Sequence, residues 1–388
     1  MATSKDLGIR TTITSTSKRL VVSYILDWLV IVLIAGLGGI FNYVKPYHRP
    51  FSLLDLSISY PIEDEFFTIT LLLLVCGLAP AVIIALIALV FIPGFRFCRG
   101  TNRAHILRLK LWEWEKGWAG FCLSLGIGFF ITQGMKNLFG KPRPNLLARC
   151  DPDLSNIASH VVGGYGQAFD ARWVLVDSSI CQQTNMRLLD DGFRSFPSGH
   201  SSFSWSAMLY LSLFMCSKFA IAIPFLPPYT TSQVAGISGS EDHQLLPLSR
   251  EGRYSSEDTQ DKSFDSRHSV ATNSQHTPIR NRAAAPPNHL IIVAFIPIGI
   301  AIWITSTRFV EYYHFGFDVI SGSLIGIGSA WFAFRWYHLP VRNGQGWAWG
   351  SRSRDRAFGI AVGTNNYVGE EGWSSARKRT RDVENGAP

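Results

Sequence analysis

Residues 66–92 read FFTITLLLLVCGLAPAVIIALIALVFI and contain no charged side chain. A segment of about 20 largely uncharged residues is long enough to cross the hydrocarbon core of a bilayer as a helix. Such a segment must be helical, because backbone polar groups cannot stay unpaired in hydrocarbon and transmembrane strands are nearer ten residues long with alternating polarity. This stretch therefore predicts a transmembrane helix.

Five further apolar blocks surround it. The six blocks cover residues 21–44, 66–92, 118–135, 201–225, 290–306 and 318–337. The chain is 47% hydrophobic and only 16% charged, which is typical of a membrane protein rather than of a set of soluble domains. We expect an all-α fold, a six-transmembrane helical bundle over residues 21–337. A cytoplasmic N-terminus (1–20) would precede this bundle, and a cytoplasmic tail (338–388) would follow it.

The basic residues predict the orientation, because cytoplasmic loops collect Lys and Arg. They gather before the first block and after the second, at Lys5, Arg10, Lys18, Arg19, Arg96, Arg99, Arg103, Arg108 and Lys110. The loop between these blocks is acidic instead. Both termini are therefore expected in the cytoplasm of a multi-pass protein of the plasma membrane or of an endomembrane (vacuole, Golgi or endoplasmic reticulum). The net charge of +8 is explained by these stretches, so nucleic-acid binding is not expected.

Two regions have the composition of disordered chain. Residues 229–286 are rich in Ser, Asp, Gln, Arg and Pro, and the tail from about Gly344 onward is similar. The first would be a disordered cytoplasmic insertion within the bundle, and the second a disordered tail.

The loop between the third and fourth blocks is expected on the lumenal or extracellular side. It contains Cys150 and Cys181, and disulfides persist on that side of a membrane, so a bridge between them is possible. It also carries a cluster of basic residues that breaks the charge bias: Lys136, Lys141, Arg143, Arg149, Arg172, Arg187 and Arg194. A basic cluster on the disfavoured side indicates an anionic target.

The first of three polar motifs is KNLFGKPRP, residues 136–144. Lys136 supplies a compact charge and Arg143 a planar fork, so together they can neutralise a phosphate dianion from two directions. Taken alone, such residues more often contact lipid headgroups.

The second motif is FPSGHS, residues 196–201, directly before the fourth block. The free N–H groups at a helix start bind anions, and Gly199 lets the backbone approach a ligand. Ser198 can donate its hydroxyl to a phosphate, and His200 can give a proton to a leaving group. The alternative is an N-capping Ser followed by a surface His.

The third motif is TRFVEYYHFGFD, residues 307–318. His314 and Asp318 are four residues apart, so on a helix they share a face and the carboxylate can hold one ring nitrogen protonated. The other nitrogen is then free to attack phosphorus. Arg308 would add a further phosphate clamp.

Together these motifs resemble those of the type 2 phosphatidic acid phosphatase family, the lipid phosphate phosphatases, whose pattern is K-x6-RP, PSGH and SR-x5-H-x3-D. Thr307 replaces the usual Ser and keeps the hydroxyl. The run KPRPNLLARCDP, residues 141–152, is most similar to fungal members related to diacylglycerol pyrophosphate phosphatase.

The resemblance implies specific roles. His314 would be the nucleophile that forms a phosphohistidine, Asp318 its orienting residue, and His200 the acid for the leaving alkoxide. The phosphoryl oxygens would be bound by Lys136, Arg143, Ser198, Gly199 and Arg308. Family members work without a metal, and no Asp, Glu or Cys pattern near the motifs predicts a metal site, so no cofactor is expected.

A site at the bilayer boundary suits an amphipathic phosphate. Phosphatidic acid, lysophosphatidic acid and diacylglycerol pyrophosphate are the expected substrates, and polyisoprenyl diphosphates and sphingoid phosphates stay open, as does the oligomeric state. An alcohol instead of water as acceptor would make the enzyme a lipid phosphotransferase. Vanadium haloperoxidases resemble the same motif set but are soluble. A catalytically silent scaffold or receptor should lack His200, His314 or Asp318, and all three are present.

Overall fold

The structure is a computed structural model, and it describes residues 18–94, 102–170, 172–223, 285–341, 346–352 and 357–358. The described residues up to Ala222 and from Pro286 onward belong to one compact unit. The insertion expected at 229–286 lies outside the described residues except for its last two positions, as does most of the expected N-terminal segment.

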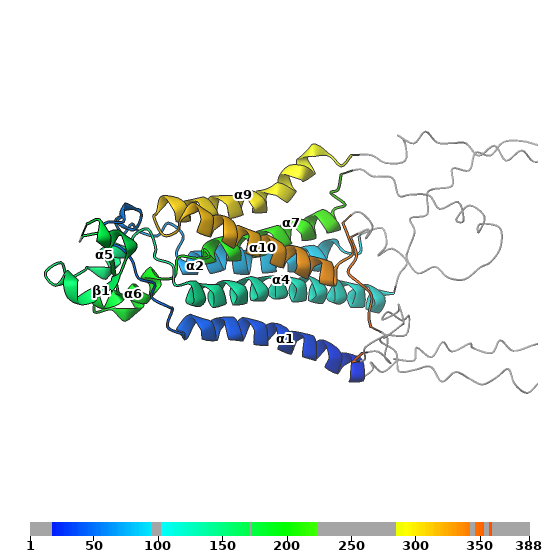
Figure 1. Cartoon of the computed structure of the whole chain (residues 1–388). Coiled ribbons are helices and arrows are strands. Elements are labelled where there is room, and N and C mark those ends of the chain that lie inside the picture. The colour runs from blue at the N-terminus through cyan, green and yellow to red at the C-terminus, as the bar shows by residue number, and fades with distance from the viewer. Residues whose placement is uncertain are drawn as a thin grey trace, which may run out of the picture. The chain divides into compact units, whose positions relative to one another are not determined.

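Long helices run side by side in this unit (Figure 1). They are α1 (Lys18–Tyr43), α4 (Arg103–Phe139), α7 (Gly199–Lys218), α9 (Asn288–Val310) and α10 (Gly316–Tyr337). A further helix covers Ile69–Phe91 and consists of α2 (Ile69–Leu72), a π-helical turn over Leu73–Leu78, α3 (Ala79–Leu86) and a second π-helical turn over Ile87–Phe91. The opening apolar stretch is therefore helical, as predicted.

Five helices in the described part of the chain are long and apolar enough to cross a membrane: Lys18–Tyr43, Ile69–Phe91, Arg103–Phe139, Asn288–Val310 and Gly316–Tyr337. The fourth expected span corresponds to α7, which is not among them. All six serines of α7 are buried, and this helix packs against α4, α9 and α10. Because its neighbours surround it, α7 needs less apolar surface than a helix that faces lipid.

Glycines allow α10 to lie very close to α7. A Cβ atom on Gly322 would collide with the carbonyl oxygen of Ser198, and one on Gly326 with that of Ser202. The backbone N–H of Ser198 also donates to the carbonyl of Asp318 at 3.0 Å. This contact holds the start of α7 against the start of α10, where the second and third motifs lie.

A small subdomain of short elements lies at one end of the bundle (Figure 1). It contains α5 (Leu146–Cys150), α6 (Met186–Gly192) and an antiparallel pair of strands, β1 (Val161–Gly163) and β2 (Leu175–Val176). Short 3-10 turns occupy Leu56–Ile58, Ile157–His160, Tyr165–Ala168 and Ser178–Ile180. A disulfide joins Cys150 to Cys181, with Cα atoms 4.6 Å apart. The subdomain has its own apolar core, which includes Phe51, Val176 and Phe193.

The expectation that the chain is disordered from about Gly344 onward is wrong for residues 346–352. The N–H of Ala348 donates to Glu113 of α4 at 3.0 Å, and Arg352 forms a 2.8 Å ion pair with Asp27 of α1. Polar side chains of α1 and α4 thus provide hydrogen-bond and ion-pair partners for this segment, so it packs on the helices although its composition is poor in apolar residues.

Candidate active site

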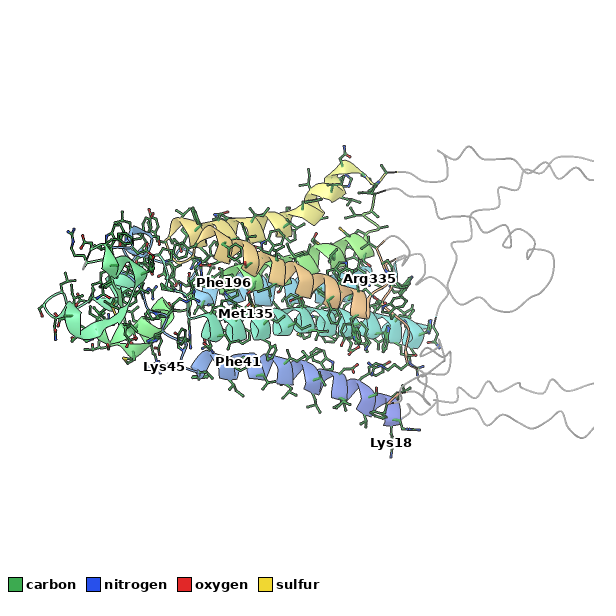
Figure 2. All side chains as sticks on the ribbon, viewed as in Figure 1. Lys18, Phe41, Lys45, Met135, Phe196 and Arg335 are labelled. Carbon is green, nitrogen blue, oxygen red and sulfur yellow. A yellow bond between two sulfur atoms is a disulfide. The ribbon has the colours of Figure 1, made fainter. Side chains whose placement is uncertain are left out.

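The three motifs meet at the end of the bundle that carries the subdomain. The first ends α4, the second begins α7, and the third connects α9 to α10. Aromatic rings join them, since Phe196 contacts Phe139 at a centroid distance of 4.8 Å and stacks on Phe317 at 5.7 Å. In Figure 2, Phe196 and Lys45 lie toward this end, whereas Lys18 and Arg335 lie toward the opposite end.

The first turn of α7 brings Lys136 close to the helix start. Ser198 is the N-cap, fully buried, and its Oγ accepts from the N–H of Ser201 at 3.5 Å. A Cβ atom on Gly199 would lie only 3.2 Å from Nζ of Lys136. Because Gly199 has no side chain, the ammonium group of Lys136 can lie next to the free N–H groups at the start of α7. A cation and a helix N-terminus side by side form an anion-binding arrangement.

His314 lies in the short connection between α9 and α10, and its side chain is almost completely buried. Its Nδ1 is 2.6 Å from the carbonyl oxygen of Ser195. A carbonyl only accepts hydrogen bonds, so Nδ1 must carry the proton, and in the neutral ring Nε2 keeps a free lone pair. Burial, together with the charges of Arg143 and Lys136, holds the pKa of His314 well below its usual range. The ring is therefore neutral and suited to nucleophilic attack.

Asp318 does not hold the imidazole of His314 directly, so the expected contact between them is wrong. Its Oδ1 is 2.7 Å from Nζ of Lys141, and its Oδ2 is 2.5 Å from the hydroxyl of Ser195 and 3.1 Å from the N–H of Phe315. Helix α10 begins at Gly316, so His314 precedes the helix and the i, i+4 geometry does not apply. Asp318 caps the first turn of α10 instead.

His200 stands in the first turn of α7, and its Nε2 is 3.0 Å from the carbonyl oxygen of Phe67. Nε2 therefore donates to this carbonyl, which leaves Nδ1 as the nitrogen that can exchange a proton with a ligand. Burial, together with the charges of Arg308 and Lys136, lowers the pKa of His200 to about 3, so this ring is also neutral when no anion is bound. Lys136 and Arg143 of the first motif lie close enough to His314 of the third to lower its pKa.

Arg308 is completely buried in the last turn of α9. Its Nη2 forms a 2.5 Å ion pair with Glu311, and its Nη1 lies 3.9 Å from Glu65. Even so, none of its three guanidinium nitrogens makes a well-directed hydrogen bond to a described residue. Buried donors normally find partners, so this guanidinium is suited to an added anion.

The guanidinium of Arg143 is held by Asp191, a residue that the sequence did not identify. Nε of Arg143 donates to the carbonyl of Asp191 and Nη2 to its Oδ1, both at 2.7 Å, while Arg149 donates to Oδ2 at 2.9 Å. Arg143, Arg149 and Arg308 all lie over the ring of Tyr313, 5.2–5.4 Å from its centroid. Asp191 thus holds two of these arginines, and the ring of Tyr313, the residue next to His314, lies against all three.

The sequence also did not single out Lys141, Arg149 and Ser195. Lys141 and Arg149 were visible as members of the basic cluster in the loop between the third and fourth blocks. Ser195 and Asp191 stand just before the FPSGH segment, and nothing in their residue types distinguishes them from other polar loop residues. Only their contacts with Asp318 and Arg143 reveal them.

Comparison with known proteins agrees with the motifs. The family model described as the PAP2 superfamily matches residues 117–238 and 243–342. A PA-phosphatase related-family protein of Dictyostelium discoideum is 30% identical over 197 residues, which cover 50% of this chain and 48% of that protein. The chain thus spans about half the length of this relative.

Fungal relatives align over more of their length. A probable diacylglycerol pyrophosphate phosphatase 1 of Schizosaccharomyces pombe is 29% identical, over 56% of this chain and 71% of that protein. The diacylglycerol pyrophosphate phosphatase 1 of Saccharomyces cerevisiae is 24% identical, over 77% of this chain and 74% of that protein. No solved structure matches. Because the family model covers more than half of the chain and all three motifs, this protein belongs to the PAP2 superfamily.

Proposed function

We propose that this protein is a metal-independent lipid phosphate phosphatase, a phosphatidate phosphatase or diacylglycerol diphosphate phosphatase that acts through a phosphohistidine. One observation carries the proposal: the buried, neutral His314 has its Nδ1 proton bound to a carbonyl and its Nε2 free, near the charges of Lys136 and Arg143. Arg308 lies over the same Tyr313 ring as Arg143. Phosphoryl transfer mainly needs positioning and neutralisation of the equatorial oxygens, and three cations can supply both.

We assign the catalytic steps to two histidines, His314 and His200. Nε2 of His314 attacks phosphorus, and the bond between phosphorus and the lipid oxygen breaks. His200 takes up a proton at Nδ1 when the anionic substrate binds, and it gives that proton to the leaving oxygen. A water molecule then attacks the phosphohistidine, gives a proton back to His200 and releases inorganic phosphate. The electron pair of the broken P–N bond returns to Nε2.

Phosphatidic acid, lysophosphatidic acid and diacylglycerol pyrophosphate are the substrates that we propose. The names of the two fungal relatives support the last of these substrates. The three motifs lie at one end of apolar helices, so a lipid headgroup can reach the cations while its acyl chains remain among the helix surfaces that face lipid.

We further propose that α7 completes a six-helix membrane bundle and that the active site faces the lumen or the cell exterior. The disulfide between Cys150 and Cys181 lies in the subdomain beside the site, and disulfides persist in oxidising compartments. Lys18 and Arg335 lie toward the other end of the bundle, which fits the excess of basic residues on the cytoplasmic side.

Phosphate release from phosphatidic acid in detergent micelles containing EDTA tests the proposal. We expect wild-type activity to survive EDTA, and His314→Ala to lose at least about 1,000-fold in kcat, the scale of losing a covalent nucleophile. His289→Ala, an exposed histidine at the start of α9, is the matched control and should retain full activity. An inactive wild type on every lipid phosphate, or an undiminished His314→Ala, would refute the proposal.

A further inference from the structure

We propose that Ser195 is a positioning residue for the nucleophile, and that Asp318 acts on His314 through Ser195 rather than by direct contact. This inference rests on the proposed function, because it assigns the residues that orient the attacking imidazole. It concerns a serine outside the three motifs, 119 residues away from His314 along the chain.

Ser195 is bound to both residues at once. Its carbonyl oxygen is 2.6 Å from Nδ1 of His314, and its hydroxyl is 2.5 Å from Oδ2 of Asp318. Ser195 and Asp318 are completely buried and His314 nearly so, so water does not compete for these hydrogen bonds. A carboxylate accepts only, so the hydroxyl must donate to it, and the carbonyl must accept from the imidazole. The protons thus define one chain of contacts from carboxylate to serine to imidazole.

Lys141 fixes the same serine from the other side. Its backbone carbonyl accepts the N–H of Ser195 at 3.0 Å, and its ammonium group is 2.7 Å from Oδ1 of Asp318. The peptide and side chain of Ser195 are therefore held by two residues that are themselves ion-paired. A carbonyl held this firmly sets both the tautomer and the direction of the imidazole ring, as orienting partners do for other reactive histidines.

A purely structural explanation is available for Asp318, because its Oδ2 also caps the first turn of α10 through the N–H of Phe315. The two explanations make different predictions for Ser195. If Asp318 only caps α10, the hydroxyl of Ser195 plays no part, and its removal should leave kcat unchanged. If Ser195 carries the effect of Asp318 to His314, losing its hydroxyl should slow the chemical step.

A double-mutant cycle with Ser195→Ala and Asp318→Asn distinguishes the capping explanation from the positioning explanation. Both kcat and KM are measured on phosphatidic acid. We expect Ser195→Ala to lower kcat about tenfold with KM changed less than twofold, because an orientation loss acts in the transition state. In the Asp318→Asn variant, adding Ser195→Ala should lower kcat less than twofold further, since the effects of residues that act through one another are not additive. Ser195→Thr, which keeps the hydroxyl, should recover most of the lost kcat.

Ser155→Ala is the matched control. Ser155 makes a comparable bond, 2.6 Å from its hydroxyl to Asp153, but both residues lie in an exposed part of the subdomain. Its kcat should equal that of wild type. Elution of each variant as a single peak in detergent, with a wild-type unfolding midpoint, verifies folding.

Two results would overturn the inference while leaving the proposed function intact. One is a Ser195→Ala enzyme as active as Ser155→Ala, in a preparation whose His314→Ala variant is inactive. The other is a full tenfold effect on the Asp318→Asn background, which would mean that the two residues act independently. An inactive wild type would instead refute the proposed function, and the inference with it.

Discussion

Replacement of Glu311 by Gln should make the protein less stable and yet more responsive to an anion. The carboxylate of Glu311 forms the 2.5 Å ion pair with Arg308, whose side chain is completely buried. Its other oxygen accepts the N–H of Phe66 at 2.8 Å, a bond that the amide oxygen of Gln can keep. The substitution therefore removes one charge and little else.

The magnitude follows from the burial of this pair. Removing one partner of a buried ion pair destabilises a protein by about 3–5 kcal/mol, because the remaining charge is left without compensation. Glu65 still lies 3.9 Å from Arg308, so we expect the lower limit, about 3 kcal/mol. At roughly 2–4 °C per kcal/mol, the unfolding midpoint should fall by about 6–12 °C.

A bound anion should restore what Glu311 supplied. Orthovanadate resembles phosphate and would place its oxygens against the uncompensated guanidinium, so its affinity should rise, and each tenfold gain adds about 1.4 kcal/mol of stabilisation at saturation. Thermal unfolding in detergent, with and without orthovanadate, measures both effects. The control is Asp170→Asn, which breaks an exposed pair with Arg172 and should move the midpoint by little.

Two results would refute this reasoning. The first is a Glu311→Gln protein as stable as wild type without vanadate. The second is a vanadate-induced rise in the midpoint that is no larger for Glu311→Gln than for wild type. Either would mean that Glu311 does not compensate the charge of Arg308.

Three further predictions concern stability and packing. Cys150→Ser opens a disulfide between residues 31 apart, so the subdomain should lose about 3–4 kcal/mol, measured as earlier loss of activity on heating. Because burial first, and then nearby cations, lower the pKa of His314, acid protonates this ring in the unfolded chain before the folded one. His314 should therefore lower the free energy of unfolding by about 1 kcal/mol between pH 7 and 5.5. This contribution should be absent when unfolding of the His314→Asn variant is measured over the same pH range. Gly322→Val should push α10 off α7 and lower activity, whereas Gly328→Val, where a Cβ meets nothing within 4 Å, should not.

The sequence alone determined which segments are helices and which side chains are the candidates for the chemistry. Long apolar blocks leave helices as the favourable structure, so their positions follow from composition and length. The residue types and spacing of the three motifs likewise pointed to phosphate chemistry, and they identified Lys136, Arg308 and His314 before any contact was known. Local spacing was sufficient because each motif is a short, continuous stretch.

Only the tertiary structure decided how these side chains are held. The spacing of His314 and Asp318 suggested a shared helix face, but α10 begins between them, and the carboxylate turns to Ser195 and Lys141 instead. Helix α7 is buried by its neighbours, a property that its own composition does not reveal. The partners of the site lie more than a hundred residues apart in some cases. Such contacts depend on how helices pack and not on local sequence, which is the physical reason that the sequence did not show them.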